Sequence, residues 1–519
     1  MTINLKIYKA CWLSNSFKKV KASVDCEFST VRGIFFPIHR YELKKIIPLG
    51  IILFITLFNH YCLKNIKDSL IVTNVGAEAL AFIKLFCVPP GAVLCMLLYT
   101  KLSDKLKNEH LFYATLSSFL CFFALFAFCL YPYRSFFHPS HDTIVGLQVM
   151  FPSAFWLFSI LGVWSYTIFF VLAELWSSFI LTLLFWQFVN QITELKDAKR
   201  IYAFLAIIGQ SAVTLSGFVG AMASDIKNNT PEFQDPWQIT LNYLIGTVIV
   251  TSIIVMFLYH WMYQHVLTDR RFYNKPYLPG IKIKKSKSSI WQGLKMAITS
   301  PYLGLIALLV ICYGINDNIL ENFWKHELKN RFPDINQYNT FMCQYTMHYG
   351  LFSMFILIIA GNIFRRFKWG IGAMITPCIV TLGGIIIFGS IFAKNYCIQC
   401  LGSALAHQSL IIFAGVVVLI GIKSSKMSFF DLSKEMAYIP LSEDLKVKGK
   451  AVVDVLGYRF GKSGGSGLQV ILLTGVTLCS GTQATYESIA PYAFIIFLLT
   501  SCVWFVAVSR LSRKIHVKN

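Results

Sequence analysis

The chain has 519 residues, of which 56% are apolar and only 14% are charged. A soluble protein carries about 25% charged residues and interrupts its apolar residues at helical or strand period, so this composition excludes an ordinary soluble protein. The formal net charge of +22 is typical of a nucleic-acid-binding protein only if the cations form a soluble basic surface, and their placement indicates otherwise.

The apolar residues come in runs of about 20, which is the length that a helix needs to cross a bilayer core of about 30 Å. We predict an all-α polytopic membrane protein with about twelve transmembrane helices, and no N-terminal signal peptide. The predicted spans are 46–63, 80–100, 111–132, 162–192, 201–223, 240–262, 301–320, 343–363, 371–393, 406–422, 451–480 and 487–508. The fourth and eleventh are long enough to be bent or broken, and the tenth is short.

The loops between these spans differ strongly in charge. With the N-terminus in the cytoplasm, the cytoplasmic segments carry 36 Lys and Arg and the opposite loops carry 8. This asymmetry follows the positive-inside rule, so we expect both termini to be cytoplasmic. Three cations fall inside the predicted spans: Lys84, Arg459 and Lys462.

The order of spans and linkers indicates two halves. A basic N-terminal segment, 1–45, precedes six spans in 46–262, and a second basic segment, 263–300, separates these from six more in 301–508. A tail, 509–519, follows. Two six-helix halves joined by a long cytoplasmic loop are typical of the major-facilitator type of secondary transporter. We interpret the linker's lysines as a solvated loop near anionic lipid.

Charged residues inside the spans are the candidate site. A charge in a bilayer is costly unless it faces water, a partner or a ligand. Lys84 lies just before Pro89 and Pro90, Lys462 lies among glycines, Glu174 lies in mid-span, and Glu321 ends the seventh span with Asp317 one turn before it on the same face. Both lysines can instead reach the interface as helix-end cations. Taken together, the four charges predict a site for an anion, in which the carboxylates hold the lysines when no substrate is bound.

The stretch GYRFGKSGGSG, 457–467, resembles a phosphate-binding P-loop but departs from it. A P-loop has four residues between its first Gly and the Gly-Lys pair and follows a buried strand, whereas Gly457 is followed by three residues within an apolar run. An ATPase is therefore not expected. The glycines either form a packing notch or open the helix so that backbone N–H groups meet an anion.

Eight short stretches of the chain form an ordered set. They are NIKDSLIVT at 65–73, FIKLF at 82–86, AELW at 173–176, LLFWQFVNQIT at 183–193, MITPCIV at 374–380, FFDLSKEMAYIPL at 429–441, VKGKAVVDV at 447–455 and LGYRFGKSGG at 456–465. In these stretches the chain resembles the nucleotide transporters (ATP/ADP carriers) of obligate intracellular bacteria and plastids, and the bacterial branch above all. The resemblance extends from about residue 36 to 508.

This resemblance implies a carrier in the inner membrane of a bacterium that exchanges nucleotides by alternating access, with ATP imported for ADP. It also implies that Lys84 and Lys462 contact phosphates and that Glu174 and Glu321 serve coupling, gating or orientation. Weaker candidates are Asn190, Lys426, Lys434 and Arg459, whose simpler interpretation is as helix-end groups. The chain departs from the family pattern at Asp317, Ser177 and Ser433 and lacks a Gln-Asn pair in 418–426, which leaves the base of the substrate open.

Several alternatives stay open at this point. The passenger is ATP and ADP or another nucleotide such as GTP, CTP or UTP, and the transport is exchange or proton symport. A membrane-embedded enzyme or a channel is a remote alternative. We expect nucleotides and the bilayer as partners, with no nucleic acid, obligate protein partner, cofactor or metal. Cys397 and Cys400 form a CxxC in an external loop, interpreted as coincidence or a local disulfide rather than a metal site.

Overall fold

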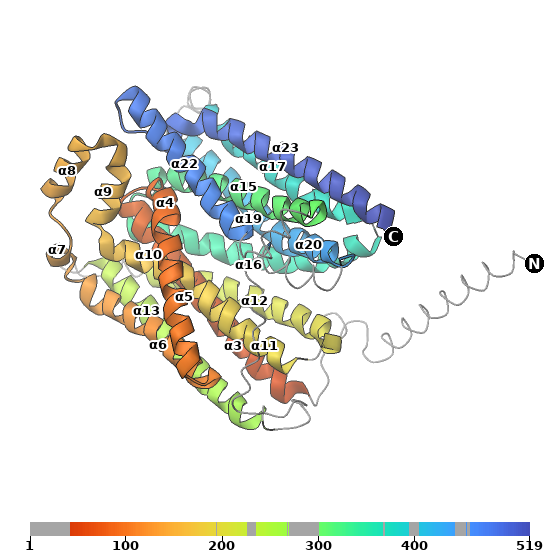
Figure 1. Cartoon of the computed structure of the whole chain (residues 1–519). Coiled ribbons are helices and arrows are strands. Elements are labelled where there is room, and N and C mark those ends of the chain that lie inside the picture. Colours follow the sequence, from red (N-terminus) through yellow and green to blue (C-terminus); the bar gives the residue numbers. More distant parts are fainter. Residues whose placement is uncertain are drawn as a thin grey trace, which may run out of the picture.

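The computed structural model describes residues 42–193, 195–225, 235–266, 268, 300–366, 369–393, 404–441, 453 and 457–518, and the regular structure in these ranges is helical (Figure 1). The first set of helices is α3 (Leu43–Asn74), α4 (Ala79–Phe82), η2 (Ile83–Cys87), α5 (Val88–Lys105), α6 (Asn108–Leu125), η3 (Phe126–Leu130), α7 (Arg134–Phe137), α8 (His141–Met150), η4 (Pro152–Ala154), α9 (Phe155–Gly162), α10 (Trp164–Trp176), η5 (Ser177–Phe185), α11 (Trp186–Ile192), α12 (Leu195–Ser224) and α13 (Pro236–His265). The second set is α15 (Pro301–Arg331), α16 (Ile335–Arg366), α17 (Trp369–Phe392), α19 (Ala404–Ser425), η7 (Lys426–Phe430), α20 (Asp431–Tyr438), α22 (Tyr458–Ser480) and α23 (Tyr486–Lys518).

The long helices are those of a multi-pass membrane protein. Eleven helical segments in the described ranges are long and apolar enough to cross a membrane. The predicted eighth span, 343–363, lies within α16, which packs along α12. The expectation of about twelve transmembrane helices is therefore confirmed. The bounds differ, however, because several helices continue past the charged residue at which the predicted span ended.

In the described residues, π-helical turns occur in the second, third and fourth predicted spans and in the continuation of the tenth. The fourth predicted span is α10, η5 and α11 in succession, so nine of its residues form a π-helical segment within the span. Lys84 lies in η2, directly before Pro89 and Pro90, which lack the N–H groups that a regular helix would bond back to this turn. The tenth span also continues through η7 and α20, so it is longer than predicted.

The molecule has two ends, which we define by its long helices. The terminal face is the end at which α3 begins and α23 finishes, and the distal face is the opposite end, where α4, α8 and α9 lie (Figure 1). The pairing of Lys325 with Asp68 and of Lys329 with Val75 places the C-terminal end of α15 at the distal face, beside the C-terminal end of α3.

Helices α12 and α16 make the closest contact between the two sets of helices, and glycine allows it. A Cβ atom on Gly217 of α12 would lie 2.4 Å from the carbonyl oxygen of Cys343 on α16. In turn, a Cβ on Gly350 of α16 would lie 2.4 Å from Thr214 Oγ1. Backbone therefore packs directly on backbone here, as small residues permit between membrane helices.

This contact predicts the effect of a single methyl group. Gly217→Ala should lower the melting temperature of the detergent-solubilised protein by several degrees, because the backbone of α16 must move and overpacking costs about 1–3 kcal/mol. The matched control is Gly246→Ala in α13, where a Cβ meets nothing within 4 Å. The control should keep or raise the melting temperature, since Ala favours a helix over Gly by about 1 kcal/mol. Equal melting temperatures for the two variants would contradict this account.

Candidate functional site

The site begins with two adjacent charged residues in α3. Lys67 Nζ lies 2.8 Å from Asp68 Oδ1, and Lys325 of α15 lies 2.8 Å from Asp68 Oδ2. The side chains of all three are at most 3% exposed. Asp68 therefore joins one lysine of its own helix to a lysine from the second set of helices.

The charges continue along α15 to α19. Lys325 Nζ lies 2.9 Å from Glu321 Oε1, one turn earlier on the same helix. Lys423, near the end of α19, lies 2.8 Å from both Glu321 Oε2 and Asp317 Oδ1. Asp317, which departs from the family pattern, thus shares the cation Lys423 with Glu321.

Glu174 of α10 extends the same series in the other direction. Its Oε2 lies 3.2 Å from Lys67 Nζ, and its Oε1 lies 3.9 Å from Lys462 Nζ on α22. The charge chain, as we call the whole series, alternates in sign: Lys462, Glu174, Lys67, Asp68, Lys325, Glu321, Lys423 and Asp317. Alternation gives each buried charge an opposite neighbour, which offsets the cost of removing it from water.

Lys84 is close to the charge chain but has neutral partners. Its Nζ donates to Asn318 Oδ1 at 3.1 Å and to Asn322 Oδ1 at 3.2 Å, both on α15. Asn318 also donates through Nδ2 to the carbonyl oxygen of Lys462 at 2.6 Å. One amide side chain therefore links the two lysines that the sequence singled out.

Exposure indicates which end of the site is open. The side chains of Lys462 and Glu174 are 32% and 28% exposed, whereas Lys325 and Asp68 are each 1% exposed. Helix α22 begins at the terminal face, because its Gly461 packs on Gly314 in the first half of α15. The exposed end of the charge chain therefore faces the terminal side.

The distal side is closed by a separate set of contacts. Glu78, between α3 and α4, pairs with His326 Nδ1 at 2.8 Å and accepts from the backbone N–H of Tyr486 at 3.1 Å. Burial raises the pKa of the Glu78 carboxyl, but the hydrogen bond and charge of His326 outweigh burial and hold that pKa below its usual value. Lys329 Nζ also donates to the carbonyl oxygen of Val75.

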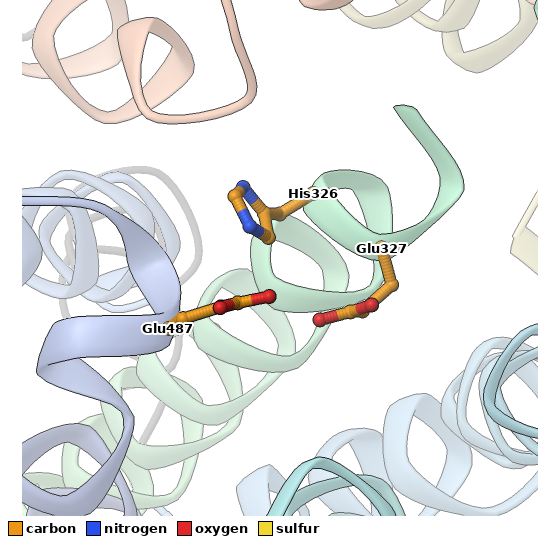
Figure 2. A group of neighbouring side chains, drawn as sticks. All are labelled: His326, Glu327 and Glu487. Carbon is orange, nitrogen blue, oxygen red and sulfur yellow. The ribbon is translucent and has the colours of Figure 1, made fainter. Parts of the chain in front are cut away.

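Figure 2 shows the titratable side chains next to this closure. His326 and Glu327 extend from α15 and Glu487 from α23, with one polar atom of each within 4.8 Å of the others. Because His326 Nδ1 already pairs with Glu78, we interpret this cluster as part of the distal closure between α15 and α23.

The glycines around Lys462 serve packing. Added Cβ atoms on Gly461 and Gly465 would lie 2.9 Å and 3.1 Å from backbone atoms of α15, so both glycines face that helix. Helix α22 continues unbroken from Tyr458 to Ser480. The glycines thus form a notch that brings α22 against α15, and the alternative of an opened helix is wrong for this structure.

The weaker candidates have different surroundings. Lys426 and Lys434 lie 3.3 Å and 3.9 Å from Asp431 at the terminal end. The centroid of the Tyr458 ring lies 5.3 Å from Lys426 Nζ and 5.2 Å from Lys462 Nζ. Arg459 donates to Ser178 Oγ across the two sets of helices at 3.1 Å. Asn190 lies in α11, and its side chain falls outside the described part, as do Cys397 and Cys400.

Sequence reasoning missed half of the charge chain. It placed Lys67 and Asp68 in the loop after the first span, Lys325 after the seventh, and Lys423 after the tenth. These placements are wrong, because all four residues lie inside helices. The count of two lysines and two glutamates was therefore too small, and Glu321 pairs with Lys325 and Lys423 rather than with Lys84.

Comparisons with known proteins give one consistent result. A model of the TLC ATP/ADP transporter family matches residues 21–515. The chain is 41% identical over 493 residues to ADP,ATP carrier protein 1 of Chlamydia muridarum, covering 94% of this chain and 91% of that protein. It is 38% identical over 491 residues to ADP,ATP carrier protein 1 of Rickettsia prowazekii, covering 94% and 97%.

Solved structures resemble the fold at low sequence identity. A bacterial homologue of the iron transporter ferroportin in an inward-facing state superposes with a TM-score of 0.54 at 15% identity, covering 91% of this chain and all of that one. A mutant of the nucleoside transporter NupG has a TM-score of 0.50 at 14% identity, covering 89% and 99%. These likenesses support the predicted major-facilitator-like fold.

Lys423 and Asp317, at the end of the charge chain, should depend on each other in their contributions to stability. Lys423→Met should destabilise the protein by about 3–5 kcal/mol, because Asp317 is 1% exposed and would be left without its cation. Adding Asp317→Asn to this variant should restore much of the stability. The measurement is the free energy of unfolding or melting temperature of both single variants and the double variant. Additive losses would show that the two side chains do not interact.

Proposed function

This chain belongs to the TLC ATP/ADP transporter family, and we propose that it carries nucleotides across a bacterial inner membrane, importing ATP in exchange for ADP. Membership of this family makes it a transporter and not an enzyme. The names of its Chlamydia and Rickettsia relatives support adenine nucleotides as the passengers. The excess of cations in the segments on the side of the termini supports a cytoplasmic location for both termini.

One observation carries this proposal: Asn318 bonds both the ammonium group of Lys84 and the backbone carbonyl of Lys462, which belong to different sets of helices. Lys84 donates to neutral amide oxygens, and Lys462 is 32% exposed and 3.9 Å from its carboxylate. Both ammonium groups are thus available to a strong anion. The phosphates of a nucleotide supply such an anion and form charge-assisted hydrogen bonds with them.

Alternating access follows from the position of these lysines. The contact between Lys462 and Glu174 is the longest in the charge chain. A phosphate that binds Lys462 therefore competes with Glu174 first. Glu174 then remains with Lys67, whose other partner is Asp68, and the change is transmitted to α3 and α15. The proposed halves, 46–262 and 301–508, would rock about the α12–α16 contact, closing the terminal side and separating Glu78 from His326.

The phosphate role of Lys462 has a direct test. Lys462→Ala should abolish uptake of labelled ATP by a bacterial host, while membrane content of the protein is unchanged, because a partly exposed cation is lost and no buried carboxylate is stranded: Glu174 keeps Lys67. The control is Lys107→Ala, an exposed lysine between α5 and α6. Uptake by Lys462→Ala at the control's rate would contradict the assignment.

A second experiment identifies the transported nucleotides and distinguishes exchange from proton symport. Uptake of labelled ATP, ADP, GTP, CTP and UTP should show ATP and ADP as substrates, with mutual competition. Preloading vesicles with unlabelled ADP should accelerate ATP uptake several-fold, because an exchanger moves most readily when loaded in both directions. Acceleration by an imposed proton gradient alone would indicate symport, and uptake that does not respond to preloading would indicate a channel.

A further inference from the structure

Lys64 of α3 is a charged residue that the proposed site has not used. It precedes Lys67 and Asp68 by about one turn on the same face of the helix, since residues three and four apart lie above one another. Lys67 reaches Glu174 on α10, and Asp68 reaches Lys325 on α15. Lys64 therefore lies in the sector of α3 between these two helices, one turn nearer to the terminal face.

Exposure places Lys64 toward the open side of the site. The side chains of Lys67 and Asp68 are 3% and 1% exposed, whereas Lys64 is partly exposed. It also lies within electrostatic range of Glu321, as Lys84 does. Lys64 thus faces the same central region as the two lysines that are proposed to contact phosphates.

Lys64 has a weak neutral partner. Lys64 Nζ lies over the Tyr61 ring, 5.7 Å from the centroid of that ring. The four carboxylates of the charge chain are engaged by the four lysines of that chain, while Lys84 is held by two amides. With Lys64 and Lys84 added to the charge chain, the group holds six lysines against four carboxylates, which is a surplus of two positive charges.

We propose that Lys64 is a third phosphate-binding lysine, which acts with Lys84 and Lys462 and makes the site select nucleoside di- and triphosphates over monophosphates. This assignment rests on the proposed function, and it adds the number of phosphates to it. A terminal phosphate carries about two negative charges near neutral pH, and each further phosphate adds about one. Lys64, Lys84 and the loosely paired Lys462 offer about three positive charges, which is one more than a monophosphate neutralises, equal to the charge of a diphosphate and one fewer than that of a triphosphate.

The test is the selectivity of Lys64→Gln among three ligands with the same base. Uptake of labelled ATP is measured with unlabelled ATP, ADP or AMP as competitor. The AMP:ATP ratio of half-inhibitory concentrations should fall about tenfold or more in Lys64→Gln, mainly through weaker ATP, and Lys64→Arg should keep most of the wild-type ratio. Lys107→Gln is the control for loss of a lysine elsewhere.

Two further variants separate phosphate binding from packing. Tyr61→Leu removes the ring on which Lys64 lies, so a packing role predicts that this variant reproduces the effect of Lys64→Gln, and phosphate binding predicts an unchanged ratio. Lys64→Met, which keeps the apolar stem, replaces Lys64→Gln if the latter does not accumulate in the membrane.

Each outcome either supports the proposed role of Lys64 or contradicts it. A collapsed ratio with rescue by Arg supports the proposal. An unchanged ratio, an equal weakening of all three ligands, or the same collapse in Tyr61→Leu overturns it. Failure of the wild-type protein to exchange any nucleotide would instead overturn the proposed function.

Discussion

The structure depends on one constraint: a charge removed from water inside a membrane needs an opposite charge beside it. Four lysines and four carboxylates meet this requirement by alternating in a single series across α3, α10, α15, α19 and α22. No member of that series can move without changing the partner of the next one. Helices that belong to both sets are thereby coupled electrostatically, in addition to their contact through the glycines of α12 and α16.

Much of the fold could be predicted from the sequence, because a run of about 20 apolar residues is the length of a membrane-spanning helix and is rare in soluble proteins. The helix ends could not. The first predicted span ends at residue 63 and the seventh at residue 320, each directly before a charged residue. The corresponding helices α3 and α15 continue for about three more turns. The missing signal was the absence of Gly and Pro beyond those residues until Gly76 and Pro333, since a helix without a breaker continues through a paired charge.

The candidate site was predicted only in part, for the same reason. Lys84, Glu174 and Lys462 lie inside longer apolar runs and were recognisable as intramembrane charges. Lys67, Lys325 and Lys423 lie near helix ends and resembled loop cations, because a sequence does not show which carboxylate will face them. The two amide partners of Lys84 could not be predicted either, because Asn318 and Asn322 contact Lys84 only when α15 lies beside η2.

The surplus of lysines in the centre has a consequence for the empty carrier. To pass from one side to the other, the site must at some moment be shut off from water at both ends. An unloaded site would then trap unbalanced ammonium groups in a low-dielectric enclosure, and the Born energy of that occluded state would make it a high barrier. A bound polyphosphate offsets the surplus positive charge and lowers the barrier. The charge imbalance would thus allow the conformational change of the loaded protein and oppose that of the empty one.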